Sequence, residues 1–188
     1  MMEAVPDMSG LLKCLLYLAA IGFSLFLAGR MMPKEIFEHD ALPFQFCRFE
    51  KRGRIYDALH IRKWKDSLPD MSILFPSLIP PKKLPKILTI AQIESMIQET
   101  CVAEWIHELL CSFGFVCIFL WKGFGGWLVS ALYALGNIPY VIIQRYNRSK
   151  LVRLLKKLQA KEATRTNRKQ EKIREKGTYI ELQYGARP

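Results

Sequence analysis

The fold of this chain is decided by residues 101–143, CVAEWIHELLCSFGFVCIFLWKGFGGWLVSALYALGNIPYVII. This stretch holds two apolar runs, 101–121 and 124–143, and little more than Lys122 and Gly123 separates them. A helix of about 20 apolar residues, rising about 1.5 Å per residue, crosses the hydrocarbon core of a bilayer. The stretch therefore predicts a hairpin of two membrane-spanning helices, the first within residues 90–121 and the second at 124–144.

A third apolar run lies near the N-terminus, at residues 11–29, LLKCLLYLAAIGFSLFLAG, and its one charge is Lys13. Acidic residues precede this run and Arg30 follows it, whereas a secretory signal has a basic start and a small-residue cleavage site. We expect a retained anchor helix here, with a cleaved signal as the alternative. The chain is thus predicted to be an all-α integral membrane protein, a single membrane domain with three transmembrane helices.

The charges of the chain are distributed unevenly along it. The net charge is +11 although 51% of the residues are hydrophobic, which points to a membrane protein. Of the 28 Lys and Arg residues, 26 lie in segments 30–100 and 145–188, and the others are Lys13 and Lys122. Because cytoplasmic loops are rich in Lys and Arg, we expect a multi-pass cell-membrane protein with its N-terminus outside and its C-terminus in the cytoplasm. Anionic lipid headgroups account for this basicity without nucleic acid.

Residues 49–88 form the predicted cytoplasmic interfacial segment. Its first part, FEKRGRIYDALHIRKWKDSLPD, has apolar residues at helical spacing among basic ones and ends near Pro69, so we expect a helix on the membrane surface. Four prolines then interrupt an aliphatic stretch, which predicts an extended segment along the interface.

The sequence indicates the start of the second long helix and the bounds of a further helix after the third span. Thr89 followed three residues later by Gln92 is a capping box, so the second long helix is predicted to begin near Ile90. After the third span, residues 149–177 alternate leucines with basic residues, which predicts a separate basic amphipathic tail helix, solvated on the membrane surface.

Each helix of the predicted hairpin carries one polar stripe. The first stripe comprises Thr100, Glu104, His107 and Cys111, within about 60° of one another, and the second repeats the spacing with Tyr133, Asn137, Tyr140 and Gln144. Folding the hairpin about Lys122 pairs His107 with Asn137, Glu104 with Tyr140, and Thr100 with Gln144. Pro139 leaves this register open to a shift of one turn.

Ionisable residues within a membrane span are costly and usually functional. A glutamate three residues before a histidine can accept the imidazole N–H, leaving the other ring nitrogen to act as a base near neutral pH. We therefore predict His107 as a general base that activates a hydroxyl and Glu104 as its orienting partner. The alternatives are polar side chains that only join the two helices and a covalent route through Cys111. No second Glu-x-x-His occurs, so we expect neither a metal nor a cofactor.

Several segments together resemble the glycosyl-4,4'-diaponeurosporenoate acyltransferase family, small bacterial membrane proteins of the staphyloxanthin pathway. The segments, within residues 49–155, are FEKRGRIY, RKWKDSLPD, MIQETCVAEWIH and NIPYVIIQRYNRSKL. The resemblance implies transfer of a fatty acyl group to a primary hydroxyl of the glucose on a C30 carotenoid ester. The N-terminal extension, the proline-rich middle and the long basic tail depart from the family pattern, so other glycolipid or polyprenyl acceptors stay open.

The residues and the resemblance together suggest a site at the cytoplasmic end of the hairpin. An acyl thioester would be the co-substrate, bound through cationic side chains, and a lipid-like glycosylated acceptor would lie between the helices among membrane lipids. The substrate-binding residues that we predict are Arg62, Lys63, Lys65, Asn137, Tyr140, Arg145, Asn147 and Arg148. Another lipid-modifying membrane transferase and a non-catalytic scaffold subunit are the alternatives. The nature of the acyl donor and the oligomeric state are not indicated.

Overall fold

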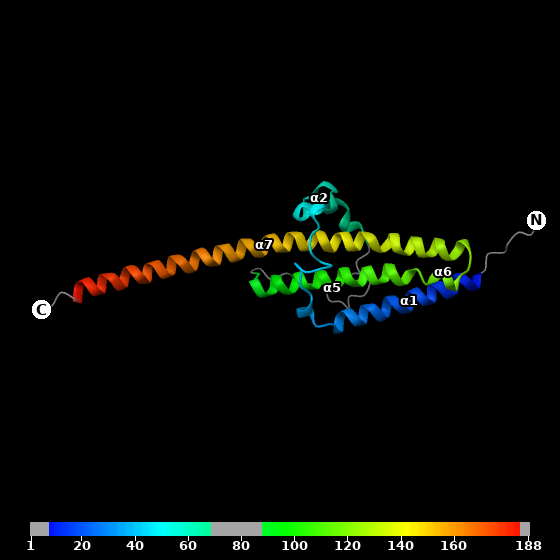
Figure 1. The fold of residues 1–188 in the computed structure, drawn as a ribbon, viewed down its shortest axis with the longest axis horizontal. Coiled ribbons are helices and arrows are strands. Elements are labelled where there is room, and N and C mark those ends of the chain that lie inside the picture. Colours follow the sequence, from blue (N-terminus) through cyan, green and yellow to red (C-terminus); the bar gives the residue numbers. More distant parts are fainter. Residues whose placement is uncertain (1–7, 69–87, 185–188) are drawn as a thin grey trace, which may run out of the picture.

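The computed structural model describes residues 8–68 and 88–184, and Figure 1 shows a bundle of long, nearly parallel or antiparallel helices. Its main elements are α1 (Met8–Met31), α5 (Ile90–Gly114), α6 (Cys117–Leu120) and α7 (Phe124–Tyr184). Three helical stretches, which begin at Met8, Ile90 and Phe124, are long and apolar enough to cross a membrane. The chain is an all-α membrane protein, as predicted.

The capping box at the start of α5 forms as the sequence indicates. The Thr89 hydroxyl accepts a hydrogen bond from the Gln92 backbone N–H at 3.3 Å, and the Gln92 side-chain oxygen accepts one from the Thr89 N–H at 3.0 Å. These bonds satisfy two of the backbone donors that the first turn of a helix leaves without partners. The helix therefore begins at Ile90 and places the polar stripe residues in fixed register with α7.

A tight turn after α6 reverses the chain into α7. Gly123 has a φ of 93°, in the left-handed region that favours glycine. At Gly126, a Cβ atom would collide with the backbone carbonyl oxygen of Trp121 and lie 2.6 Å from that of Cys117. The two backbones approach so closely that only glycine fits at this position.

The N-terminal helix α1 packs beside the hairpin at the end where the chain turns. Cys14 and Leu18 are buried against Cys117 of α6, and the Tyr17 hydroxyl donates a hydrogen bond to the Phe113 carbonyl oxygen at 3.1 Å. Other large apolar side chains of α1, such as Leu16, are exposed on the outside of the bundle. These positions suit lipid contact, as expected for the anchor predicted at residues 11–29.

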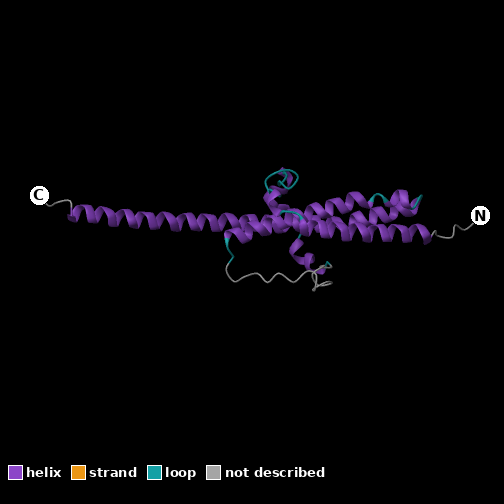
Figure 2. Ribbon diagram, turned by 90° about the horizontal axis from the view of Figure 1, so that it is seen from below, coloured by secondary structure: helices purple, strands orange, loops and turns teal. Residues whose placement is uncertain are grey.

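Helix α7 differs from the prediction of a span at 124–144 followed by a separate tail helix at 149–177. It is a single helix of 61 residues that contains Pro139 and extends far beyond the start of α5 (Figures 1 and 2). No glycine or proline lies between 144 and 149, and apolar residues up to Leu158 pack against the start of α5, so nothing interrupts the helix there. The tail therefore continues the axis of the span, and side chains 159–174 are exposed.

The predicted surface helix after residue 49 is also broken into shorter pieces. These are η2 (Arg48–Gly53), α2 (Arg54–Ala58), α3 (Ile61–Trp64) and η3 (Lys65–Ser67), preceded in the chain by η1 (Lys34–Ile36). Gly53 and His60 have φ values of 87° and 51°, and these left-handed residues end one helical turn and start another. Tyr56 and Ile61 pack against Tyr146 of α7, so this segment is attached to the hairpin. The predicted proline-rich extended segment falls on residues 69–87, outside the described part of the chain.

The close approach at the turn can be tested with a matched pair of substitutions. Gly126→Ala should destabilise the hairpin, because the added methyl group meets rigid backbone atoms. Gly136→Ala, on the same helix, meets nothing within 4 Å and should leave stability unchanged or slightly raised, because alanine favours a helix. Thermal unfolding of the purified variants in detergent checks both. A Gly126→Ala protein as stable as Gly136→Ala would contradict the packing described here.

Candidate active site

His107 of α5 lies against Asn137 of α7, in the register that the sequence predicts. The imidazole Nδ1 is 2.9 Å from the Asn137 Oδ1, and the Asn137 Nδ2 donates a hydrogen bond to the Tyr133 carbonyl oxygen at 2.9 Å. The second bond orients the amide so that its oxygen faces the ring. An amide oxygen can only accept, so this contact requires a hydrogen on Nδ1, and in a neutral imidazole Nε2 then carries the lone pair.

Tyr140 completes the surroundings of the histidine. Its ring stacks on the imidazole with 4.9 Å between ring centroids and 10° between planes. The His107 side chain is half-buried, so the ring is fixed on one side and still accessible from outside the bundle. Among the described residues, Asn137 makes a polar contact with His107 and Tyr140 makes a ring contact with it.

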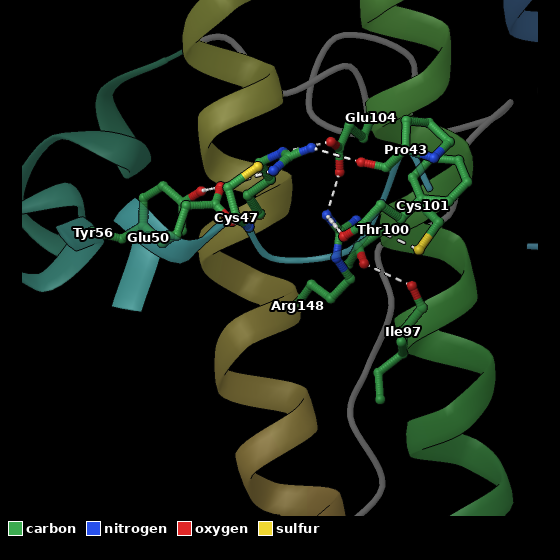
Figure 3. Close-up of polar contacts among 11 residues, drawn as sticks. Pro43, Cys47, Glu50, Tyr56, Ile97, Thr100, Cys101, Glu104 and Arg148 are labelled. Atoms are coloured by element: carbon green, nitrogen blue, oxygen red, sulfur yellow. Dashed lines mark hydrogen bonds and ion pairs between the residues drawn. The ribbon is translucent and has the colours of Figure 1, made fainter. Parts of the chain in front are cut away.

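The expected pair between Glu104 and His107 is not present. Glu104 is fully buried, and its Oε1 accepts a hydrogen bond from the Arg145 Nε at 2.6 Å (Figure 3). Its Oε2 lies 2.5 Å from the Arg148 Nη2, at ion-pair distance. A carboxylate that is buried away from solvent needs positive charge close to it. Two guanidinium groups supply that charge, whereas a neutral imidazole does not. The prediction that Glu104 orients His107 is therefore wrong in this geometry, as is its pairing with Tyr140.

The ion pairs of Glu104 extend to the segment before α2. Arg145 Nη1 donates to Glu50 Oε1 at 2.7 Å, and Arg145 Nη2 donates to the Pro43 carbonyl oxygen at 3.0 Å. Glu50, also buried, accepts hydrogen bonds from the Tyr56 hydroxyl and from the Cys47 backbone N–H. Burial and the bond to Glu50 raise the pKa of Tyr56 above its usual range, so it stays a neutral donor. This network fastens η2 to both helices of the hairpin.

Arg148 is buried among protein groups, which disfavours its predicted role at a donor phosphate. The side chain is fully buried, and its Nη2 donates to the Phe44 carbonyl oxygen at 3.1 Å. The guanidinium also lies 5.8 Å and 5.7 Å from the ring centroids of Phe44 and Phe46. Arg145 is only 15% exposed and carries the contacts to Glu50, Glu104 and Pro43. Neither arginine is open to an incoming phosphate.

The remaining predicted cations lie nearer the surface. Arg62 and Lys63 are exposed on α3, Lys65 is 3.4 Å from Asp66, and Asn147 is half-buried on α7. Their predicted contact with substrate stays a prediction. Among the described residues, no group of three or more His, Cys, Asp or Glu side chains is placed to hold a metal ion.

Glu50 is the important site residue that sequence reasoning missed. In the sequence it is one acid among the basic residues of FEKRGR, a pattern typical of a solvated surface. Its burial depends on Arg145, which is 95 residues away in the chain. No local pattern indicates such a partner.

Comparison with known proteins identifies the family of the chain. The profile of the glycosyl-4,4'-diaponeurosporenoate acyltransferase family matches residues 33–157. The chain belongs to this family. It is 32% identical over 150 residues to the glycosyl-4,4'-diaponeurosporenoate acyltransferase of Staphylococcus aureus strain Newman, covering 79% of this chain and 89% of the relative. The protein of the same name in strain N315 is 32% identical over 145 residues, with 76% and 86% covered. No solved structure matched the chain.

Membership of the acyltransferase family confirms the resemblance of residues 49–155 and makes the chain an enzyme. The matched region begins after α1 and contains Glu50, Glu104, His107, Asn137 and Arg145. It ends at residue 157, where α7 leaves the bundle. The ion-pair network and the histidine site thus both lie in the part of the chain that the family shares.

The buried network predicts a large difference between two glutamates of α5. Glu104→Gln leaves Arg148 buried without a full countercharge and should cost about 3–5 kcal/mol of stability. Glu99→Gln removes a carboxylate that pairs with Lys34 at 2.6 Å nearer the surface, and should cost about 0–1 kcal/mol. Denaturant unfolding of both variants in the same detergent measures the difference. Equal losses would show that Glu104 is not the centre of the network.

Proposed function

We propose that this protein transfers a fatty acyl group from a thioester donor to a sugar hydroxyl of a glycosylated carotenoid or a related glycolipid. The names of its relatives, glycosyl-4,4'-diaponeurosporenoate acyltransferases, support this acceptor class. The apolar outer surface of the bundle suits an acceptor with a long hydrocarbon part. The observation that carries the catalytic part of the proposal is the contact between His107 Nδ1 and Asn137 Oδ1.

In the proposed reaction, His107 acts as the general base through Nε2. The acceptor hydroxyl oxygen attacks the thioester carbonyl carbon while Nε2 takes the hydroxyl proton. The carbon–sulfur bond then breaks, the leaving thiolate takes the proton from the imidazolium, and an ester and a free thiol result. Asn137 and Tyr140 hold the ring in the required tautomer and plane, so both are positioning residues.

The proposed orientation places this site at the cytoplasmic side of the cell membrane. It rests on the charge asymmetry, because the segments that carry 26 of the 28 Lys and Arg residues adjoin one end of the hairpin. His107 is six residues beyond Cys101, where the apolar run begins, or about 9 Å along the helix. An acceptor sugar at the headgroup level then lies within a short distance of the imidazole. Arg62, Lys63, Lys65 and Asn147 are at this end and remain proposed substrate contacts.

The catalytic proposal is tested by His107→Ala, which should lower kcat by about 10² to 10⁴, the usual contribution of positioned proton transfer. Asn137→Ala should lower kcat by about 10-fold, because the base remains but its tautomer and orientation are no longer fixed. The double variant should be little slower than His107→Ala, because the two residues act as one unit. Acyl transfer from a labelled acyl thioester to a glycosylated carotenoid gives the rates.

A control distinguishes catalysis from helix packing. Ser112→Ala removes an exposed hydroxyl that bonds only within α5, to the Glu108 carbonyl oxygen, and should keep normal turnover. All rates are measured on the folded, monodisperse fraction. Near-normal turnover per folded molecule in His107→Ala, with a loss of thermal stability, would show that the polar residues only join the helices.

A further inference from the structure

The part of α7 beyond the bundle carries a regular row of positive charge. At about 100° per residue, five basic residues fall within a sector of about 80° on the helix surface. We name this row the cationic stripe, and it comprises Lys157, Lys161, Arg165, Arg168 and Lys172. All five side chains are exposed. Glu162 and Glu171 lie about 60° and about 40° outside the sector, so no acid interrupts it.

The continuity of α7 separates this stripe from the lipid surface. The apolar run ends at Ile143, and a rise of about 1.5 Å per residue places Lys157 about 20 Å and Lys172 about 43 Å further along the axis. Helix tilts of up to about 40° shorten these heights by about a quarter. Since the Debye length is about 8 Å at physiological salt, lipid headgroups attract these side chains only weakly. The stripe therefore faces the aqueous phase.

The chain itself shows that this face of α7 binds carboxylates. Lys150 lies seven residues before Lys157, and therefore on the same face. Its Nζ is 2.5 Å from the Asp57 Oδ1 of α2, and Arg153 lies 3.7 Å from the other oxygen. The hydrogen bond from Lys150 lowers the pKa of Asp57. Beyond α2 the stripe continues the row of basic side chains on this face, and these side chains are exposed to solvent.

The described residues next to the histidine and around the cavity offer little to the phosphates of a small nucleotide thioester. Arg145 and Arg148, next to the histidine site, are both held by Glu104. A cavity of about 420 Å³ beside α5 and α7 is lined by the acids Glu38, Asp40 and Glu94, against Lys156. Three carboxylates around one amine repel phosphate.

We infer that the cationic stripe is a docking surface for an acidic protein that carries the acyl group as a thioester. The inference rests on the proposed function, which requires a thioester donor. The stripe extends over about 22 Å, the scale of a protein surface rather than of a single phosphate group. A protein carrier holds its acyl thioester on a long flexible arm, so docking and reaction can take place at separate points of the enzyme. Arg62 and Lys63 are exposed on α3 next to Ile61, which packs on Tyr146 of α7, so they add positive charge between the stripe and the site.

The test compares two double variants with the same loss of charge, in the full-length protein reconstituted in nanodiscs. Lys161→Gln/Arg165→Gln removes charge from the stripe, and Lys169→Gln/Arg174→Gln removes it from other faces of the same exposed helix. The probe is a bacterial acyl carrier protein loaded with palmitate, and the measured quantity is its Kd. The stripe variant should bind about ten-fold more weakly and the control less than two-fold, with a Kd that rises with salt.

The Kd values of the two variants decide whether the stripe binds the carrier. Equal weakening in both variants, or no binding of the carrier to the unmodified enzyme, overturns the inference. A stripe variant that keeps carrier binding but loses affinity for anionic vesicles assigns the stripe to the membrane instead. Turnover with palmitoyl-coenzyme A should be unaffected by the stripe substitutions. Because the Kd is measured without turnover, absence of acyl transfer from either donor refutes the proposed function while the docking result still stands by itself.

Discussion

The buried carboxylate of Glu104 is the constraint on which the end of the bundle opposite the Lys122 turn depends. A fully buried charge is tolerated only with close countercharge and hydrogen bonds; from the facing helix, Arg145 supplies both and Arg148 adds a second countercharge. Because one arginine also holds Glu50 and the other the Phe44 carbonyl, the same charge fixes the loop before α2. The register of α5 against α7 thus follows from an electrostatic requirement as well as from apolar packing.

This arrangement separates two tasks that the polar stripe of α5 performs. Glu104 and its arginines fix the helices, and His107, one turn further along, lies between an amide and an aromatic ring. An amide partner sets the tautomer of the imidazole without adding a charge to the membrane span. An additional unpaired carboxylate at this depth would destabilise the protein. The rigid network therefore supports the histidine without contacting it, as a precise site on a helical scaffold requires.

The sequence predicts the parts of this structure that depend on periodicity and local signals. Apolar run lengths give the three long helices, the Thr89 capping box gives the start of α5, and the 4, 3, 4 spacing gives the contact between His107 and Asn137. It does not predict the partners of Glu104, because arginine side chains reach several residues beyond the opposite position. It also misses the left-handed His60, because the apolar spacing across that position is compatible with one continuous helix. Family membership supports the acyltransferase activity, whereas the roles of individual side chains follow from geometry.

Because α7 is one continuous helix that extends beyond its membrane-spanning part, a change in the tilt of the span also moves its far end. Hydrophobic mismatch changes the tilt of a spanning helix, and a continuous helix carries that rotation beyond the bilayer. Arg174 lies about 46 Å beyond Ile143, so a change of about 10° in tilt displaces it by about 8 Å. A change in bilayer thickness would therefore move the C-terminal end of α7.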